Sequence, residues 1–140
     1  MTKGEIAEHC FKGGFNCAAS VLSSFCEEYD LDTELATKLA CGLGGGYGEG
    51  GICGAASAGV LVVGLKYGQS IQGDTGSKTN CYAKTAQFID AFRQKNSALT
   101  CDELLADKPQ GNEEEAVKER RQFCAGLVKG AAEILEELGY

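Results

Sequence analysis

Eight cysteines occur among the 140 residues of this chain, and their thiols are the side chains most able to do chemistry. Cys17, Cys53 and Cys101 each fall where the flanking residues predict the start of a helix. A helix N-terminus stabilises a thiolate through its free N–H groups and its dipole, which lowers the pKa of the cysteine. Because the thiolate is the form that attacks disulfides and binds metals, these three positions are candidates for redox chemistry or metal ligation.

The remaining cysteines lie on or beside predicted apolar faces of helices, where a free thiol is usually a small core residue. They are Cys10, Cys26, Cys41, Cys81 and Cys124. Cys124, in the middle of the last predicted helix, becomes a candidate if the helix-start cysteines point toward it. Packing is also the alternative explanation for the helix-start cysteines themselves.

The spacing of the cysteines excludes several familiar sites. No pair has the C-x-x-C spacing, so neither a thioredoxin-like couple nor a local zinc knuckle is encoded, and the C-x-x-C-H haem attachment pattern is absent. His9, the only histidine, is next to Cys10, but adjacent side chains on a helix diverge and do not form a nucleophile pair. Any cysteine site must therefore be assembled from distant segments.

Between positions 42 and 51, seven of ten residues are glycine. The stretch 46–51 matches the G-x-G-x-x-G pattern, which in dinucleotide-binding proteins joins a strand to a helix. Here residues 32–41 are predicted as helix, so we interpret the stretch as a tight loop between closely packed backbones. The alternative is a loop shaped to hold a thiolate or a metal cluster. Its candidate cofactor-binding residues are Gly44, Gly45, Gly46, Gly48 and Gly51.

Apolar residues recur at the three-to-four spacing of amphipathic helices, and no stretch alternates as a half-buried strand would. The expected fold is all-α, with five or six helices packed around a central apolar helix of small residues that begins near Ile52. Thr2, Asn16 and Thr100 are expected helix caps. The predicted helical ranges are 2–12, 16–29, 32–40, 52–67, 79–96, 100–105 and 113–138.

Length and composition favour one soluble globular domain over residues 1–140. The formal net charge of −7 would repel a phosphate backbone, so nucleic acid is not an expected partner. Residues 1–15 lack the apolar run of a secretory signal, and the apolar stretch 52–65 is shorter than the roughly 20 residues that span a membrane. We therefore expect a cytoplasmic location, where thiols stay reduced, and no membrane insertion.

Two sequence blocks carry a resemblance to a known family. The segment FNCAASVL at 15–22 and the segment CGAASAG at 53–59, with the glycine loop between them and two lone cysteines after them, resemble the C_GCAxxG_C_C family of redox-active proteins. The resemblance extends from Phe15 to Leu135. It implies that the four cysteines of the family pattern are Cys17, Cys53, Cys101 and Cys124.

The resemblance implies redox chemistry without naming a reaction or a substrate. The family is also similar to the N-terminal part of split-Soret cytochromes, which carry iron–sulfur and haem centres, although this chain lacks their haem motifs. The leading hypothesis is that the four cysteines converge beside the glycine loop for thiol–disulfide redox or electron transfer. The second is that they hold an iron–sulfur cluster or another thiolate-bound metal. The third is a non-catalytic helical binding or oligomerisation module with cysteines filling its core.

Partners follow from these hypotheses. A redox site calls for a redox partner protein or a small thiol, and the small-residue faces of the helices could pair in a homodimer. In a metal-free site, Cys53 is expected to be the most reactive thiol, because helix N–H groups after the glycine loop would lower its pKa. Glu49 would raise this pKa if it turned inward, although the surrounding glycines leave the loop free to keep it in solvent.

Overall fold

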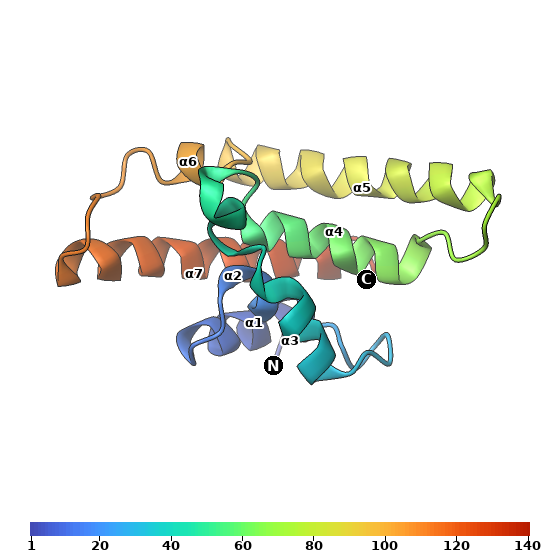
Figure 1. Cartoon of the computed structure of the whole chain (residues 1–140), viewed down its shortest axis with the longest axis horizontal. Coiled ribbons are helices and arrows are strands. Elements are labelled where there is room, and N and C mark those ends of the chain that lie inside the picture. The colour runs from blue at the N-terminus through green and yellow to red at the C-terminus, as the bar shows by residue number, and fades with distance from the viewer.

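Helices account for 69% of the chain and there is no strand, so the predicted all-α class is confirmed. The computed structural model describes all residues from 1 to 140 (Figure 1). There are seven α-helices, one for each of the seven predicted ranges and so more than the five or six expected to pack together, with a short irregular turn, η1, after the third. The elements are α1 Lys3–Lys12, α2 Cys17–Ser23, α3 Thr33–Cys41, η1 Gly46–Gly50, α4 Gly54–Tyr67, α5 Thr75–Asn96, α6 Cys101–Leu104 and α7 Glu114–Glu137.

The central position belongs to α4, as its small apolar residues predict. It packs against α2, α5 and α7, and every residue from Gly54 to Gly59 is buried. The long helices α4, α5 and α7 run roughly side by side, and the short helices α1 to α3 lie below them in the view of Figure 1. None of the helices combines the length and apolar content that crossing a bilayer requires.

Side-chain caps fix where the helices begin. The side-chain oxygens of Thr2, Asn16, Asp32 and Thr100 each accept a hydrogen bond from the backbone N–H three residues later. These caps satisfy N–H groups that have no partner inside the helix. An unpredicted cap, Asp74, starts α5 earlier than expected, because its carboxylate accepts hydrogen bonds from both the N–H and the hydroxyl of Ser77, at 3.2 and 2.6 Å.

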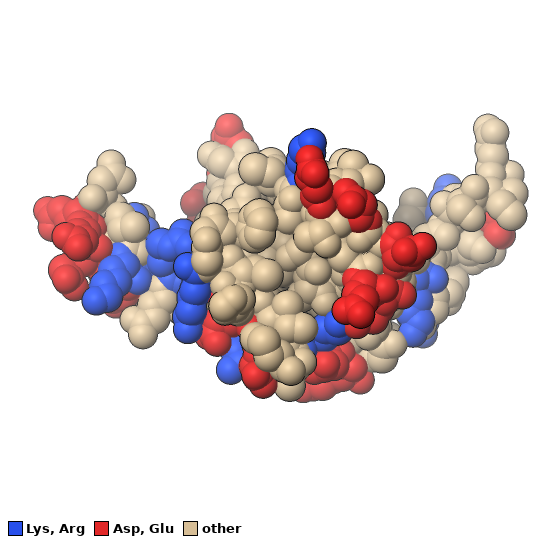
Figure 2. All heavy atoms as spheres, turned by 90° about the horizontal axis from the view of Figure 1, so that it is seen from below, with Lys and Arg blue, Asp and Glu red and all other residues tan.

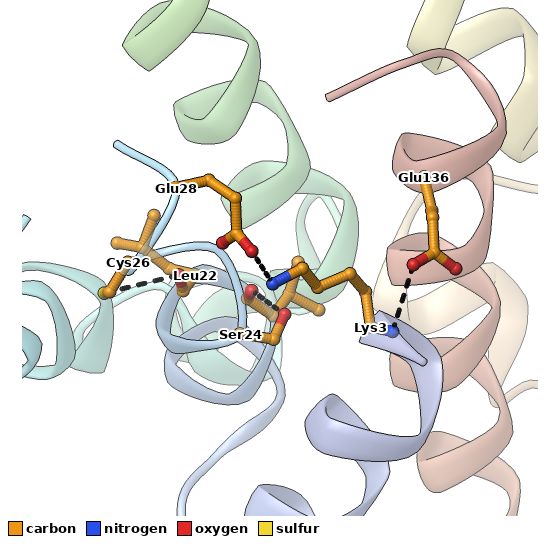
Figure 3. A network of polar contacts seen from close by, with 7 residues as sticks. Lys3, Leu22, Ser24, Cys26, Glu28 and Glu136 are labelled. Carbon is orange, nitrogen blue, oxygen red and sulfur yellow. Dashed lines mark hydrogen bonds and ion pairs between the residues drawn. The ribbon is translucent and has the colours of Figure 1, made fainter. Parts of the chain in front are cut away.

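The second helix is shorter than predicted and ends at Ser23 instead of Tyr29. Beyond Ser23 the backbone N–H groups bond three residues back, as that of Ser24 does to the Val21 carbonyl at 3.2 Å. The Ser24 hydroxyl donates to the same carbonyl at 2.6 Å (Figure 3). A hydroxyl that competes for a helix carbonyl favours such a tighter turn. The apolar side chain of Phe25 is buried nevertheless, so the predicted face survives the change in winding.

Lys3 ties this turn region to the first and last helices. Its ammonium group pairs with the carboxylate of Glu28, and its backbone N–H donates to the carboxylate of Glu136 at 3.4 Å (Figure 3). The hydrogen bond from Lys3 lowers the pKa of Glu28. Because α1 also packs along α7, these contacts hold the N-terminal helices against the long helices that carry the site.

Gly59 sets the close approach of α4 and α5. A Cβ at this position would collide with the ring of Phe88, whereas a Cβ at Gly64, one and a half turns further along α4, would meet nothing within 4 Å. We expect Gly59→Ala to destabilise the protein by about 1–3 kcal/mol, since overpacking a rigid ring outweighs the gain in helix propensity. Urea unfolding curves measure the change.

The matched control is Gly64→Ala. It adds the same methyl group to the same helix in open space and should stabilise the protein by about 0.5–1 kcal/mol through helix propensity alone. Equal stabilisation by both substitutions would mean that Phe88 does not constrain Gly59.

Candidate functional site

A single cavity of about 300 Å³ is lined by all four cysteines of the predicted site. They reach it from different elements: Cys17 begins α2, Cys53 caps α4, Cys101 begins α6, and Cys124 lies within α7. The predicted helix-start positions of the first three are thus confirmed. A cavity of this volume is at the lower end of the range for small-molecule sites.

A short pairing of two distant segments brings Cys53 and Cys101 together. Ile52 forms an antiparallel bridge with Thr100, which is why α4 begins after Ile52. On either side of this bridge, the N–H of Cys53 donates to the Leu99 carbonyl at 2.9 Å, and the N–H of Cys101 donates to the carbonyl of residue 51 at 2.7 Å. The two cysteines are therefore fixed through their own backbones.

Cys17 is held in place from both sides. The Asn16 side chain before it accepts from the Ala19 N–H at 2.9 Å and donates to the carbonyl of Cys41 at 2.7 Å, which links α2 to the end of α3. On the other side, a Cβ at Gly54 would collide with the sulfur of Cys17. The sulfur of Cys17 thus lies against the first turn of α4, immediately after Cys53.

The glycine loop supports the cavity more than it lines it. Of the five predicted glycines, only Gly45 lines the cavity, and the carbonyl of Gly51 accepts the bond from Cys101. Gly44 lies against the Asn16 side chain, Gly46 packs on the backbone of Gly51, and a Cβ at Gly48 would meet nothing.

Left-handed backbone favours glycine at four positions of this loop. Gly45, Gly46, Gly48 and Gly50 have φ between 61 and 73°, a region that side chains disfavour. Tyr47 adopts the same conformation with a φ of 64°, and its hydroxyl is 3.2 Å from that of Ser57 on α4. Glu49, two residues further along the loop, is exposed, so of the two orientations considered it takes the one in solvent.

The expected low pKa of Cys53 is wrong. Burial raises the pKa of this thiol to about 12, and the backbone N–H groups of Ala55 and Ala56 only partly oppose the effect of burial. The start of α4 does face the sulfur, as predicted. Because Cys53 is 5% exposed, the loss of solvation outweighs these helix N–H groups.

The other cavity thiols show the same effect of burial. Burial raises the pKa of Cys124 to about 11, and burial also raises the pKa of Cys101. For Cys53, Cys101 and Cys124 alike, the nearby charge of Cys17 adds to the rise. Cys124 also adds to the rise at Cys53, and Cys101 adds to the rise at Cys124, so Cys17 and Cys124 each lie near all three other thiols.

Two arginines that sequence reasoning missed also line the cavity. The Arg120 guanidinium donates to the carbonyls of Pro109 and Gly111 at 2.6 and 2.7 Å, and that of Arg121 donates to the Phe11 carbonyl at 3.2 Å. Their charges lower the pKa of Cys124, although less than burial raises it. They precede this cysteine by four and three residues, so helical spacing would have placed them on its face.

The cysteines outside the family pattern do not line this cavity. Cys26 is buried in the core, where its thiol donates to the Leu22 carbonyl at 3.6 Å and burial raises its pKa (Figure 3). Cys41 is exposed at the end of α3, and Cys10 and Cys81 are half-buried. The expectation that these cysteines are core residues therefore holds for Cys26 and does not hold for the exposed Cys41.

The four thiols form a donor set that suits soft metals or an iron–sulfur cluster. Nevertheless, no three histidine, cysteine, aspartate or glutamate side chains converge in a way that could hold a metal ion. A single-ion site would therefore require the thiols to move closer together.

The fold and the cavity define a helical protein with four cysteines around one cavity. The chain belongs to the family described as "Putative redox-active protein (C_GCAxxG_C_C)", whose pattern it matches over residues 15–138. The resemblance drawn from the two sequence blocks is thus confirmed. No curated protein and no solved structure matches the chain.

Proposed function

We propose that the protein is a thiol–disulfide redox protein in which Cys17 and Cys53 form the reversible disulfide. The observation that carries the proposal is that the four cysteines of the family pattern, from four separate elements, line one cavity. Membership of a redox-active family supports the same chemistry. Cysteines that merely filled the core would have no reason to share a cavity.

Cys17 is the attacking thiol in this proposal. It is half-buried, whereas Cys53 is buried, so an incoming disulfide reaches Cys17 first. Its sulfur lies against the first turn of α4, immediately after Cys53. Cys53 then serves as the resolving thiol, because it directly precedes the residue that the Cys17 sulfur touches.

The oxidant is the disulfide of a small molecule or of a partner protein. The Cys17 thiolate attacks one of its sulfurs, breaks the S–S bond and releases one thiol, which takes up a proton. Cys53 loses its proton and attacks the Cys17 sulfur of the mixed disulfide, which releases the second thiol. In total, two protein thiols lose two electrons and two protons, and the oxidant becomes two thiols.

Titration of free thiols in anaerobically purified protein tests this function. A small disulfide should remove about two thiols per chain, a reductant should restore them, and peptide mapping should show the bond between Cys17 and Cys53. In the Cys17→Ser variant, the small disulfide should no longer remove these two thiols. Cys81→Ser, which removes a half-buried cysteine outside the cavity, should leave it unchanged.

Iron, sulfide and absorbance measurements on the same preparation separate the alternatives. Stoichiometric iron and sulfide with charge-transfer bands would replace the proposal by an iron–sulfur electron-transfer protein with the same four ligands, which the all-thiolate donor set favours. A constant thiol count without bound metal would contradict both of these functions. It would favour the third hypothesis, a non-catalytic helical binding or oligomerisation module.

A further inference from the structure

A second, basic pocket adjoins the thiol cavity between α1 and α7. Its volume is about 500 Å³, and Phe11 and Arg121 line both spaces. The Arg121 guanidinium lies over the ring of Phe11, 4.4 Å from its centroid, and donates to the carbonyl of the same residue. These two side chains therefore form the shared wall between the outer pocket and the thiols.

Cations outnumber anions around the outer pocket, although the whole chain carries a formal charge of −7. Lys12, Lys118 and Arg121 line it, with Glu8 as the one acid. Lys12 is 3.6 Å from Glu8, and Lys118 takes part in none of the six ion pairs of the chain. In Figure 2, basic side chains gather beside the acidic end of α7 at the left of the view.

The inner cavity has the opposite character. Apart from the cysteines and the two arginines, its wall is mainly apolar and includes Leu104, Val117 and Leu127. A ligand that occupies both spaces would place an uncharged sulfur group among the thiols and a negative group outside, between the lysines. Such a division matches a small molecule in which carboxylates flank a disulfide.

We propose that the site takes small disulfides that bear carboxylates, with the S–S bond at Cys17 and a carboxylate in the outer basic pocket. This assignment rests on the proposed thiol–disulfide function and names its substrate class. The exchange is the one described above: the S–S bond of the substrate breaks, Cys17 and Cys53 are oxidised, and two thiols that bear carboxylates leave. The lysines act only by attracting the substrate and holding its charge.

Two disulfides of opposite charge test the proposal. The reduced protein is treated at low ionic strength and neutral pH with 3,3′-dithiodipropionate, a dianion, or with cystamine, a dication. Mass spectrometry follows oxidation of Cys17, and each rate is divided by the rate of the same reagent with urea-unfolded protein, which removes the difference in intrinsic reactivity. The net charge of the protein alone would favour the dication.

We expect the folded protein to favour the dianion instead, by about tenfold, and 0.5 M salt to reduce this preference. Lys118→Gln and Lys12→Gln should each lower the preference about threefold, the size of one exposed charge interaction. Lys78→Gln near the start of α5 is the control, because it removes the same charge from a helix that lines neither pocket. It should leave the preference unchanged.

A third oxidant, a small disulfide-bonded protein, separates failure of the inference from failure of the function. Equal rates for both small disulfides, faster reaction of the dication, or an effect of Lys78→Gln as large as that of Lys118→Gln would overturn the assignment of the substrate class alone. Oxidation of Cys17 by the protein disulfide but by neither small one would also overturn it and leave the redox function standing. If none of the three oxidises Cys17, the function and the inference fall together.

Discussion

In metal-free, reduced protein at pH 8, Cys53 should react with iodoacetamide about a thousandfold more slowly than it does after unfolding in urea. The reason is its pKa, which burial raises to about 12. At pH 8 a thiol with this pKa is thiolate in only about one molecule in ten thousand, whereas an ordinary thiol with a pKa near 8.5 is thiolate in about one in four. Only the thiolate reacts at a useful rate.

The pH dependence gives the same prediction a second readout. The alkylation rate of Cys53 should rise about tenfold for each pH unit above 8, and that of Cys124, whose pKa burial raises to about 11, should rise in parallel from a higher starting value. Mass spectrometry of peptides measures both. The exposed Cys41 is the internal control for the activity of the reagent, since the reagent reaches it in folded and unfolded protein alike.

Stability must fall over the same pH range. A thiol whose pKa is raised by folding stabilises the folded state fully below the pKa of the unfolded thiol, near 8.5, and loses this contribution as the pH rises toward the folded value. For Cys53 the loss is about 1.4 kcal/mol per pH unit above 9. The alkylation series should therefore stop near pH 9.5, with circular dichroism to confirm folding. Rapid modification of Cys53 in folded protein at pH 8 would contradict its burial.

The error about Cys53 shows what local sequence can and cannot predict. The glycine loop and the small residues after it correctly indicated a helix start at this cysteine, because capping depends on a few neighbouring residues. The pKa depends instead on how much solvent the rest of the fold removes, and α2, α5 and α7 pack around α4 from far along the chain. The position of a helix N-terminus, and with it the helix dipole, can be predicted from sequence more easily than the burial of a side chain can.

The same distinction holds for the rest of the site. Helix starts at Cys17 and Cys101 were predictable from the residues before them, and the arginines on α7 could have been found from their helical spacing to Cys124. The bridge between Ile52 and Thr100 has no comparable signal, because a single pair of residues is too short to show strand alternation. This bridge is nonetheless what joins two of the four cysteines.

Gly54 sets the position of the Cys17 sulfur. A methyl group here would collide with that sulfur and would lie only 3.1 Å from the Leu43 carbonyl oxygen, so the thiol or the glycine loop would have to move. The surrounding fold holds Cys17 in place, since it follows Asn16, whose side chain makes two hydrogen bonds. Gly54→Ala is thus a change that moves the attacking sulfur without removing any thiol.

We expect Gly54→Ala to slow closure of the disulfide between Cys17 and Cys53 about a hundredfold, which is the effect that a displacement of about 1 Å has on a step that depends on positioning. The first exchange, between Cys17 and a small disulfide, should change much less, so the mixed disulfide should accumulate and be visible by mass spectrometry. Gly64→Ala, the open-space substitution on the same helix, should oxidise at the wild-type rate. Unfolding in urea shows whether both variants are folded. If Gly54→Ala closes its disulfide as fast as Gly64→Ala does, the contact between Cys17 and the start of α4 does not position the reaction, and Cys53 is not the resolving thiol.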